Sequence, residues 1–436
     1  MSARRSNPFG AIAATVAALI CCGQPHPSEA QTRTSTSPEI ATFVPRPPQQ
    51  QSPAADANAG EFQAFLAALW PEAAARGISR ATFDQVLRDV TLDQEVLSHL
   101  ENQPEHTKSA SEYMRQLVSP LRIEAGRSKL AELRPLLARI EAAFGVDRHV
   151  VLAIWGVESS FGTAMGGRPV VRSLATLAFG DRRRPQYWRG ELLTTLKVLQ
   201  RGEVTAEQMV GSWAGAMGHT QFMPASYAAH AVDFDADRRR DIWSSVPDAL
   251  ASTASYLKAS GWLVGEPWGY EAVLPPRFDC AHADPAVSHS LFEWLELGVR
   301  PPPGRTFLPT ARPLQLILPA GARGPAFLVT RNFRAILRYN SSTLYALAVG
   351  HLADRLAGAP ELATKWPADD RALDRAERME LQQRLLALGL DAGDIDGVIG
   401  GQTRAAIRVF QRSSGLPTDG HPGPALLDAL RRAQRS

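Results

Sequence analysis

The stretch AIWGVESSFG, residues 153–162, places a single carboxylate, Glu158, at the end of a strongly apolar run. At helical spacing most apolar residues of this run share one face, and Glu158 continues the neighbouring row after Val151 and Trp155. A helix over 147–161 therefore holds the acid at the border of its apolar face, where partial burial raises a carboxyl pKa toward that of a general acid. From these residues alone, a solvated glutamate on a helix face remains the alternative.

Helical periodicity dominates the chain from Phe62 onward. The main helices are expected at 109–124, 130–143, 147–161, 187–200, 206–213, 246–260 and 341–356. Strand-like patterns are short, and they occur near Tyr270, at 314–319 and at 326–330. The pattern predicts a mainly α domain with a small β element.

A second segment, SWAGAMGHTQFMPASY at 212–227, combines glycines with Gln221 and a proline. By itself it also fits a helix-ending loop filled by methionine. The glycines of the first stretch, Gly156 and Gly162, leave room for another chain or a ligand to approach closely. Together with VESSFG, this segment resembles the B-type family of membrane-associated lytic murein transglycosylases. Further matching segments are RRPQYWRGEL, DFDADRRRDIW, ASTASYL and NFRAILRYNSSTLYALAVGHLADRL, so the resemblance spans residues 60–358.

The resemblance implies a lysozyme-like helical fold with a groove for glycan strands. In that family the glutamate of the ES motif is the catalytic carboxylate, which maps to Glu158. It would first protonate the glycosidic oxygen between N-acetylmuramic acid and N-acetylglucosamine, and then act as a base on the muramyl C6 hydroxyl. The product would be a 1,6-anhydro sugar, with no cofactor required. A lysozyme-type hydrolase and a non-catalytic wall-binding scaffold remain the alternatives.

The resemblance also implies residues that bind substrate in the groove. Carried over by motif are Ser159, Ser212, Gln221, Tyr256, Tyr339 and Tyr345, with Tyr113, Arg183 and Arg184 as further candidates. A tyrosine ring can cover a sugar face while its hydroxyl forms a hydrogen bond, but core packing explains each tyrosine equally well. The DRRRP run that contains the two arginines also fits a solvated surface.

An aspartate-rich loop, DFDADRRRDIWS at 233–244, places Asp at positions 1, 3 and 5 of a calcium-loop pattern. Arg238 replaces the turn glycine and Ser244 replaces the closing glutamate, so the pattern is incomplete. Asp248 could supply a later ligand, and the arginines could instead pair with the aspartates. We therefore expect no metal in the catalytic site, and any ion in this loop would be structural.

The chain divides by composition into five segments. They are a signal peptide (1–30), a disordered linker (31–58), the catalytic domain (59–358), a second linker (359–374) and a C-terminal domain (375–436). Arginines followed by an apolar run and the small-residue pattern SEA predict export. Lipidation at Cys21 or Cys22 would tether the protein to a membrane, but ALI before them lacks the expected small residue, which favours cleavage after Ala30.

The C-terminal segment contains LQQRLLALGL, GDIDGVIGGQTRAAIRVFQ and GLPTDG. It resembles the three-helix peptidoglycan-binding domain of wall hydrolases, although a generic helical bundle for protein contacts shares the small-domain pattern. The implied partner is the glycan strand of peptidoglycan, and we expect a periplasmic monomer. The net charge of +3 is too small to indicate nucleic-acid binding. After export Cys280 would be the single cysteine, and its surroundings favour a packed, inert thiol.

Overall fold

The computed structural model describes residues 53–101 and 108–433, with side chains over 58–100 and 108–433. The described residues form two compact units, one from 53–100 with Gly166–Gly215 and the other from the rest. The expected signal peptide and most of the first linker lie outside the described residues. No helix within the described part is long and apolar enough to cross a membrane.

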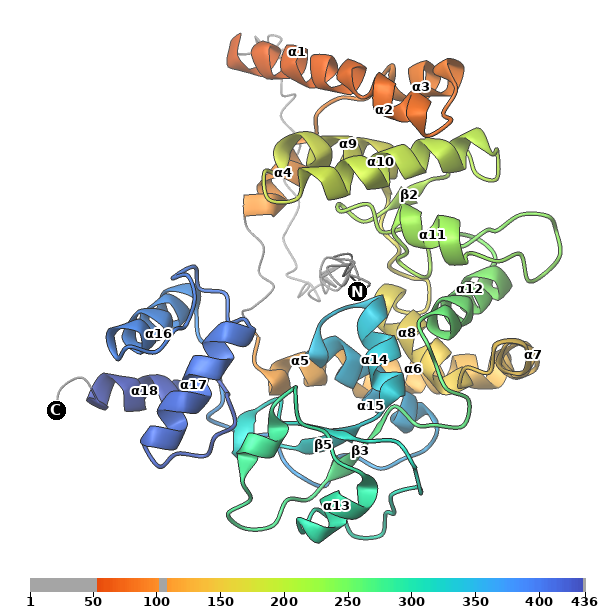
Figure 1. Ribbon diagram of the computed structural model, residues 1–436. Helices are drawn as coiled ribbons and strands as arrows, with labels where there is room; N and C mark the ends of the chain where they lie inside the picture. Colours follow the sequence, from red (N-terminus) through yellow and green to blue (C-terminus); the bar gives the residue numbers. More distant parts are fainter. Residues whose placement is uncertain (1–52, 102–107, 434–436) are drawn as a thin grey trace, which may run out of the picture. The chain divides into compact units, whose positions relative to one another are not determined.

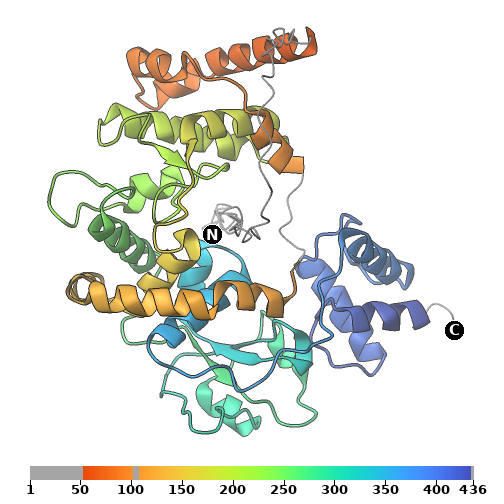
Figure 2. The ribbon, with the colours of Figure 1, turned by 180° about the vertical axis from the view of Figure 1, so that it is seen from behind.

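The first unit is a set of helices closed by a small ribbon. Its elements are α1 (Pro53–Ala68), α2 (Trp70–Ala75), α3 (Arg80–Leu87), α4 (Gln94–Glu101), β1 (Arg168–Pro169), α9 (Val170–Gly180), α10 (Pro185–Gln200) and β2 (Val210–Gly211). Helices α9 and α10 lie side by side (Figures 1 and 2). Their apolar faces bury Leu174 and Trp188 completely, and Phe62 of α1 meets Phe179 edge to face at 5.4 Å. Because α1 begins at Pro53, the last residues of the expected linker are helical.

The prediction of a helix at 206–213 is wrong. Its start forms only one turn, in which Thr205 and Gln208 cap each other through side-chain hydrogen bonds of 3.1 and 3.3 Å. The chain then extends into β2, where Gly211 pairs with Arg168 of β1. A Cβ at Gly166 would lie 2.3 Å from the Gly211 carbonyl oxygen, so this ribbon needs glycine for its close backbone approach.

Among its described residues, the second unit contains α8, which carries Glu158, and eight further helices before the C-terminal domain. They are α5 (Ala110–Leu117), α6 (Pro120–Glu132), α7 (Arg134–Phe144), α8 (Arg148–Ser159), α11 (Pro224–His230), α12 (Val246–Ala259), α13 (Leu291–Glu296), α14 (Arg331–Tyr339) and α15 (Thr343–Leu356). Helices α5 and α6 follow one another in a row (Figure 2), and α7 packs against α6 and α8. The single helix expected at 109–124 is broken, because Pro120 cannot donate to the preceding turn and Ser119 caps a new helix by accepting the Arg122 N–H at 3.3 Å.

The small β element is confirmed as a three-stranded antiparallel sheet. Strands β3 (Gly269–Ala272), β5 (Ala326–Val329) and β4 (Gln315–Ile317) pair in that order, with Leu328 opposite both Tyr270 and Leu316. Short 3-10 turns, η1 (Cys280–Ala283) and η2 (Gly321–Arg323), flank the sheet. Its core includes Trp294 from α13 and Leu316, both fully buried. Cys280 is buried, as expected for a packed thiol, and burial raises its thiol pKa to about 11.

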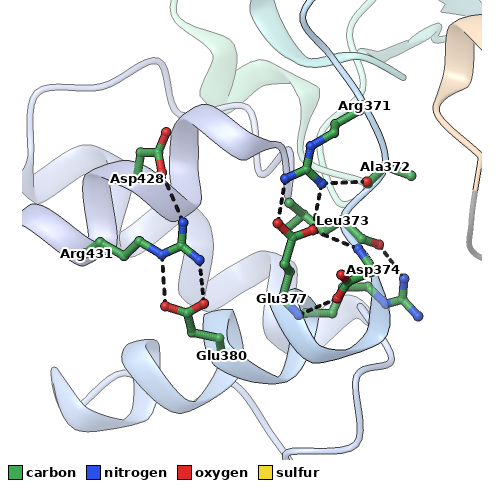
Figure 3. Close-up of polar contacts among 9 residues, drawn as sticks. Arg371, Ala372, Leu373, Asp374, Glu377, Glu380, Asp428 and Arg431 are labelled. Atoms are coloured by element: carbon green, nitrogen blue, oxygen red, sulfur yellow. Dashed lines mark hydrogen bonds and ion pairs between the residues drawn. The ribbon is translucent and has the colours of Figure 1, made fainter.

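The C-terminal domain has three helices, α16 (Arg375–Ala387), α17 (Gly401–Ser413) and α18 (Pro424–Ala433). Leu381, Ile407 and Leu430 contribute one side chain from each helix to a shared core. Three of the ion pairs on its surface are Arg371–Glu377, Arg431–Glu380 and Arg431–Asp428 (Figure 3). The guanidinium of Arg431 donates to both oxygens of Glu380 at 2.9 and 2.6 Å, joining α18 to α16. Such a small core benefits from this bidentate pairing.

Candidate active site

Helix α8 carries the acid in its last turn and is buried from Val150 to Ser159. The Asp147 side chain begins the helix by accepting the His149 N–H at 2.7 Å. The helix ends in a tight turn, where Ser160 and Phe161 have φ of 48° and 58° and Gly162 has φ of 87°. Two consecutive non-glycine residues in the left-handed region are unusual and cost backbone energy, which is typical of functional sites.

The glycines around the acid admit the protein's own rings rather than another chain. A Cβ at Gly156 would lie 2.6 Å from the Phe161 ring, which folds back over the helix. A Cβ at Gly162 would lie 2.3 Å from the His219 ring. The sequence-based interpretation that these glycines leave room for a ligand is therefore wrong, because both spaces are filled by aromatic side chains of the same unit.

Glu158 is almost completely buried, with 6% of its surface exposed. The hydroxyl of Tyr345, on α15, donates to its Oε1 at 2.5 Å. Its second oxygen, Oε2, is buried and has no hydrogen-bond partner among the described residues. A buried polar atom without a partner is costly unless a ligand or water supplies one, so Oε2 marks the side of the carboxyl that is left for chemistry.

Burial raises the pKa of Glu158 from its ordinary 4.5 to about 8, and the hydrogen bond from Tyr345 offsets part of the rise. The carboxyl group is therefore protonated at neutral pH. Because Oε1 already accepts from Tyr345 and Oε2 has no partner among the described residues, Oε2 is the oxygen that can direct a proton to a substrate. A carboxylic acid with its donor directed to no protein group is suited to give that proton to a bound substrate.

Three aromatic rings pack together beside this carboxyl. Tyr339 contacts Tyr256 and Phe222 with ring centroids 4.9 and 5.7 Å away. The hydroxyl of Tyr339 donates to the Thr220 carbonyl at 2.6 Å, and that of Tyr256 donates to the Arg338 carbonyl at 2.5 Å. Burial raises the pKa of Tyr339 well above 10, and the charge of Glu158 raises it further, so this phenol stays protonated. The hydroxyl groups of both predicted tyrosines thus donate to backbone carbonyls.

The GHTQF turn brings two further unpartnered atoms. Gln221 has φ of 51°, and its Nε2 donates to the carbonyls of Met165 and Gly218 at 3.0 and 2.9 Å. Its Oε1, and the Oγ1 of the neighbouring Thr220, are buried without a hydrogen-bond partner within the described part of the chain. Gln221 was predicted as a substrate residue, whereas Thr220 was missed because its type alone gave no signal.

Ser159 is the predicted site residue that the structure does not offer to a ligand. It is fully buried, and its hydroxyl donates to the His219 carbonyl at 2.8 Å and accepts the Gly162 N–H at 3.2 Å. His219 itself accepts from the indole N–H of Trp155 at 3.0 Å, and burial lowers its pKa, so it stays neutral. Ser159 and His219 therefore brace the end of α8, and this role of His219 was missed from the sequence.

The remaining predicted residues are distributed over both units. Tyr113, on α5, lies near enough to Tyr345 to raise its pKa further. Ser212, Arg183 and Arg184 belong to the first unit, and Ser212 is buried there. Both arginines approach the buried carboxylate of Asp181, at 3.4 and 4.0 Å, which partly neutralises them.

The aspartate loop forms a compact set of oxygen donors. Carboxylate oxygens of Asp233, Asp235, Asp237 and Asp248 lie within 4.8 Å of one another. Asp248 is fully buried, and burial raises its pKa, whereas the other three are exposed. Four hard oxygen ligands fit a calcium ion, although backbone N–H groups already donate to several of them, such as that of Phe234 to Asp248 at 2.7 Å. Any ion here would stabilise the loop before α12.

Two family descriptions match the chain. The family of the transglycosylase SLT domain matches residues 61–354, and the family of the putative peptidoglycan binding domain matches residues 374–430. The chain is 30% identical to membrane-bound lytic murein transglycosylase B of Escherichia coli, over 77% of this chain and 94% of that protein.

Solved structures agree with these matches. SltB3 of Pseudomonas aeruginosa, solved in complex with NAG-anhNAM-pentapeptide, is 48% identical, covers 85% of this chain and 99% of its own, and superposes with a TM-score of 0.81. The lytic transglycosylase Slt35 of Escherichia coli, solved in complex with calcium, is 30% identical over 69% of this chain and 94% of its own, with a TM-score of 0.57. The chain belongs to the lytic transglycosylases of the SLT family and carries a C-terminal domain of the peptidoglycan-binding family.

Proposed function

We propose that this protein cleaves the β-1,4 bond between N-acetylmuramic acid and N-acetylglucosamine in peptidoglycan without water, and releases 1,6-anhydromuramyl products. Glu158 is the proposed acid and base. The observation that carries the assignment is the placement of this side chain, which is buried and, among the described residues, hydrogen-bonded through one oxygen only. This burial raises its pKa to about 8.

In the first step, Oε2 of Glu158 donates its proton to the glycosidic oxygen. The bond from that oxygen to the muramyl anomeric carbon breaks, the N-acetylglucosamine side leaves as an alcohol, and positive charge develops on the muramyl ring. The N-acetyl carbonyl of the substrate can share this charge. Tyr345 continues to donate to Oε1 and so stabilises the carboxylate as it forms.

In the second step, the carboxylate of Glu158 removes the proton from the muramyl C6 hydroxyl. The C6 oxygen forms its bond to the anomeric carbon, which closes the 1,6-anhydro ring and restores the protonated acid. The nucleophile belongs to the substrate and is already positioned, so the protein needs no second carboxylate to hold a water molecule or to form a sugar ester.

For substrate contacts, the proposal keeps Gln221 and adds Thr220, because each has a buried oxygen without a protein partner. Ser212, Tyr113, Tyr256, Tyr339, Arg183 and Arg184 remain predicted contacts, and Tyr345 is assigned to positioning the acid. The boundaries 59–358 and 375–436 remain the proposed extents of the catalytic and wall-binding domains. The second of these would hold the enzyme near its insoluble substrate and raise the local glycan concentration.

The cellular setting is also a proposal. Residues 1–30 have the charge order and cleavage pattern of an export signal, which would deliver the protein to the periplasm as a monomer. A membrane tether would require lipidation at Cys21 or Cys22.

Mass spectrometry of purified murein digested by the wild-type protein and by Glu158→Gln tests the proposal. The wild type should release anhydromuropeptides, and the variant should release none while keeping its folded circular dichroism spectrum. Reducing-end sugars would instead identify a hydrolase, and the absence of fragments would identify a wall-binding scaffold. Turnover by Glu158→Gln would refute the assignment of the acid.

A further inference from the structure

A cavity of about 690 Å³ lies away from Glu158, in the second unit. Its walls come from α5, α6, the C-terminal half of α15 and the segment that follows α15. That segment, residues 361–366, belongs to the linker expected at 359–374 from its composition. The volume of the cavity is in the range of pockets that bind small organic ligands.

The linker wall is held in place by a buried ion pair. The carboxylate of Glu271, on β3, accepts the N–H groups of Ala363 and Thr364 at 3.0 and 2.8 Å. Arg305 donates to the same carboxylate at 3.0 Å and to the Glu361 carbonyl at 2.6 Å. Because the Glu271 side chain is 1% exposed, this anchor is well shielded from water, and the cavity has a built wall rather than a loose strand along one side.

The charges inside the cavity are mixed, with an excess of cations. Arg115, Arg127, Arg355 and Lys365 line it together with Glu124 and Glu361. The Nε of Arg355 is buried without a hydrogen-bond partner, and Lys365 has neither a hydrogen-bond nor an ion-pair partner among the described residues. The closest carboxylate to Arg355 is that of Glu361, at 4.0 Å, and the Glu361 side chain is 89% exposed.

The rest of the lining is mainly apolar and aromatic, with Ser111, His351 and Thr364 as its polar members. Met114 and Ile123 are buried in the wall, and the half-buried Trp366 also lines the cavity. A compact polyanion such as a nucleotide phosphate would meet Glu124 and gain little from this surface. A ligand with separated carboxylates on an apolar chain fits this lining better. Its carboxylates would pair with the arginines and the lysine, and an ammonium group would pair with Glu124.

We propose that this cavity binds a short peptide that carries free carboxylates and an amine. One source of this peptide is the stem attached to the muramyl sugar in the groove, and for that source the proposal rests on the proposed function. Tyr345, which touches the acid, and Arg355, which lines the cavity, are ten residues apart on α15, or about 15 Å along the helix axis at roughly 1.5 Å per residue. An extended pentapeptide spans about 17 Å, so an attached stem is long enough to bridge this separation. Free peptide released from the wall is the second source.

The test uses the full-length protein, the double variant Arg115→Gln/Lys365→Gln, and Lys197→Gln, which removes an exposed charge outside the cavity. Isothermal titration calorimetry with the free stem pentapeptide (alanyl-γ-glutamyl-diaminopimelyl-alanyl-alanine) measures binding directly. In parallel, kcat/KM is measured on glycan strands that carry stem peptides and on strands from which an amidase has removed them.

We expect the double variant to bind the free pentapeptide at least tenfold more weakly, whereas Lys197→Gln binds like the wild type. If attached stems occupy the cavity, the ratio of kcat/KM on peptide-bearing strands to that on bare strands also falls about tenfold. If free peptide is the occupant, binding weakens while the ratio is unchanged. Equal binding by wild type and double variant, or no binding by the wild type, overturns the proposal.

These outcomes separate this proposal from the proposed function. If the wild type released no anhydromuropeptides from either kind of strand, the proposed lytic activity would be refuted. Calorimetry would still decide whether the cavity binds peptide. Conversely, an active enzyme that does not bind the pentapeptide would refute the peptide site alone.

Discussion

The burial of Glu158 has a cost in stability that depends on pH. The substitution Glu158→Gln removes the ionisable group and keeps an oxygen that accepts from Tyr345. Below pH 4.5 both the folded and the unfolded wild type hold the proton, so the variant and the wild type should be about equally stable. Between pH 4.5 and about 8 only the folded protein holds it, because burial raises the pKa of the folded state. The unfolded state therefore gains free energy by ionising, and the wild type loses stability as pH rises.

The size of this effect follows from the two pKa values. At roughly 1.36 kcal/mol per pKa unit, a rise from 4.5 to about 8 destabilises the wild type by about 3 kcal/mol at pH 7 and about 5 kcal/mol above pH 8. Urea unfolding followed by tryptophan fluorescence at pH 4, 7 and 9 should show the unfolding free energy of Glu158→Gln exceeding that of the wild type by these amounts as pH rises. Glu61→Gln, at an exposed position on α1, is the control, and its difference from the wild type should stay nearly constant. A Glu158→Gln advantage that does not grow with pH would refute the buried, protonated acid.

Three other substitutions test neighbouring features. Tyr345→Phe removes the donor that favours the ionised carboxyl, so the alkaline fall of kcat/KM should move to higher pH because the pKa of Glu158 rises further. Gly162→Ala should lower the unfolding free energy by more than about 2 kcal/mol in thermal or urea melts. The comparison is Gly261→Ala, which has a similar φ of 89° but open space around its Cβ and should cost only about 1 kcal/mol. Glu380→Gln breaks a bidentate ion pair near the surface of the C-terminal domain and should destabilise that domain by about 0.5 to 1 kcal/mol at neutral pH. Because ion pairing lowers the pKa of Glu380 to about 2, this loss should diminish as pH falls from 4.5 toward 2.

Local patterns predicted most of the helices and the sheet, because each has a periodicity or a cap within its own residues. Helix α8 begins directly after Asp147, where the expected helix over 147–161 starts, and the three strands lie where short apolar runs occur. The errors arose where backbone chemistry overrode the pattern. Pro120 interrupts the helix that the apolar spacing predicted at 109–124. The segment at 206–213 does not form the predicted helix, because its end extends into β2 and pairs with β1.

The acid itself was predictable, but its surroundings were not. An apolar run that ends in one carboxylate indicates partial burial, whereas the hydroxyl that holds Oε1 comes from Tyr345, which lies 187 residues further along the chain. Likewise, Gly156 and Gly162 signalled close approach without saying which group approaches. Those partners are set by tertiary packing, and a single sequence contains no local signal for them.

The burial that makes Glu158 useful also explains why its helix is so apolar. A cost of about 5 kcal/mol at alkaline pH equals the burial of two or three large apolar side chains at roughly 1.5 to 3 kcal/mol each. Helix α8 buries more than that number, since Val150, Val151, Leu152, Ile154, Trp155 and Val157 all have 8% or less of their surface exposed. An exposed acid would avoid the cost, but it would be ionised at neutral pH and would have no proton to give. The apolar run and the acid at its end therefore depend on each other. The packing of α8 supplies the folding free energy that offsets the cost of burying Glu158 with its proton.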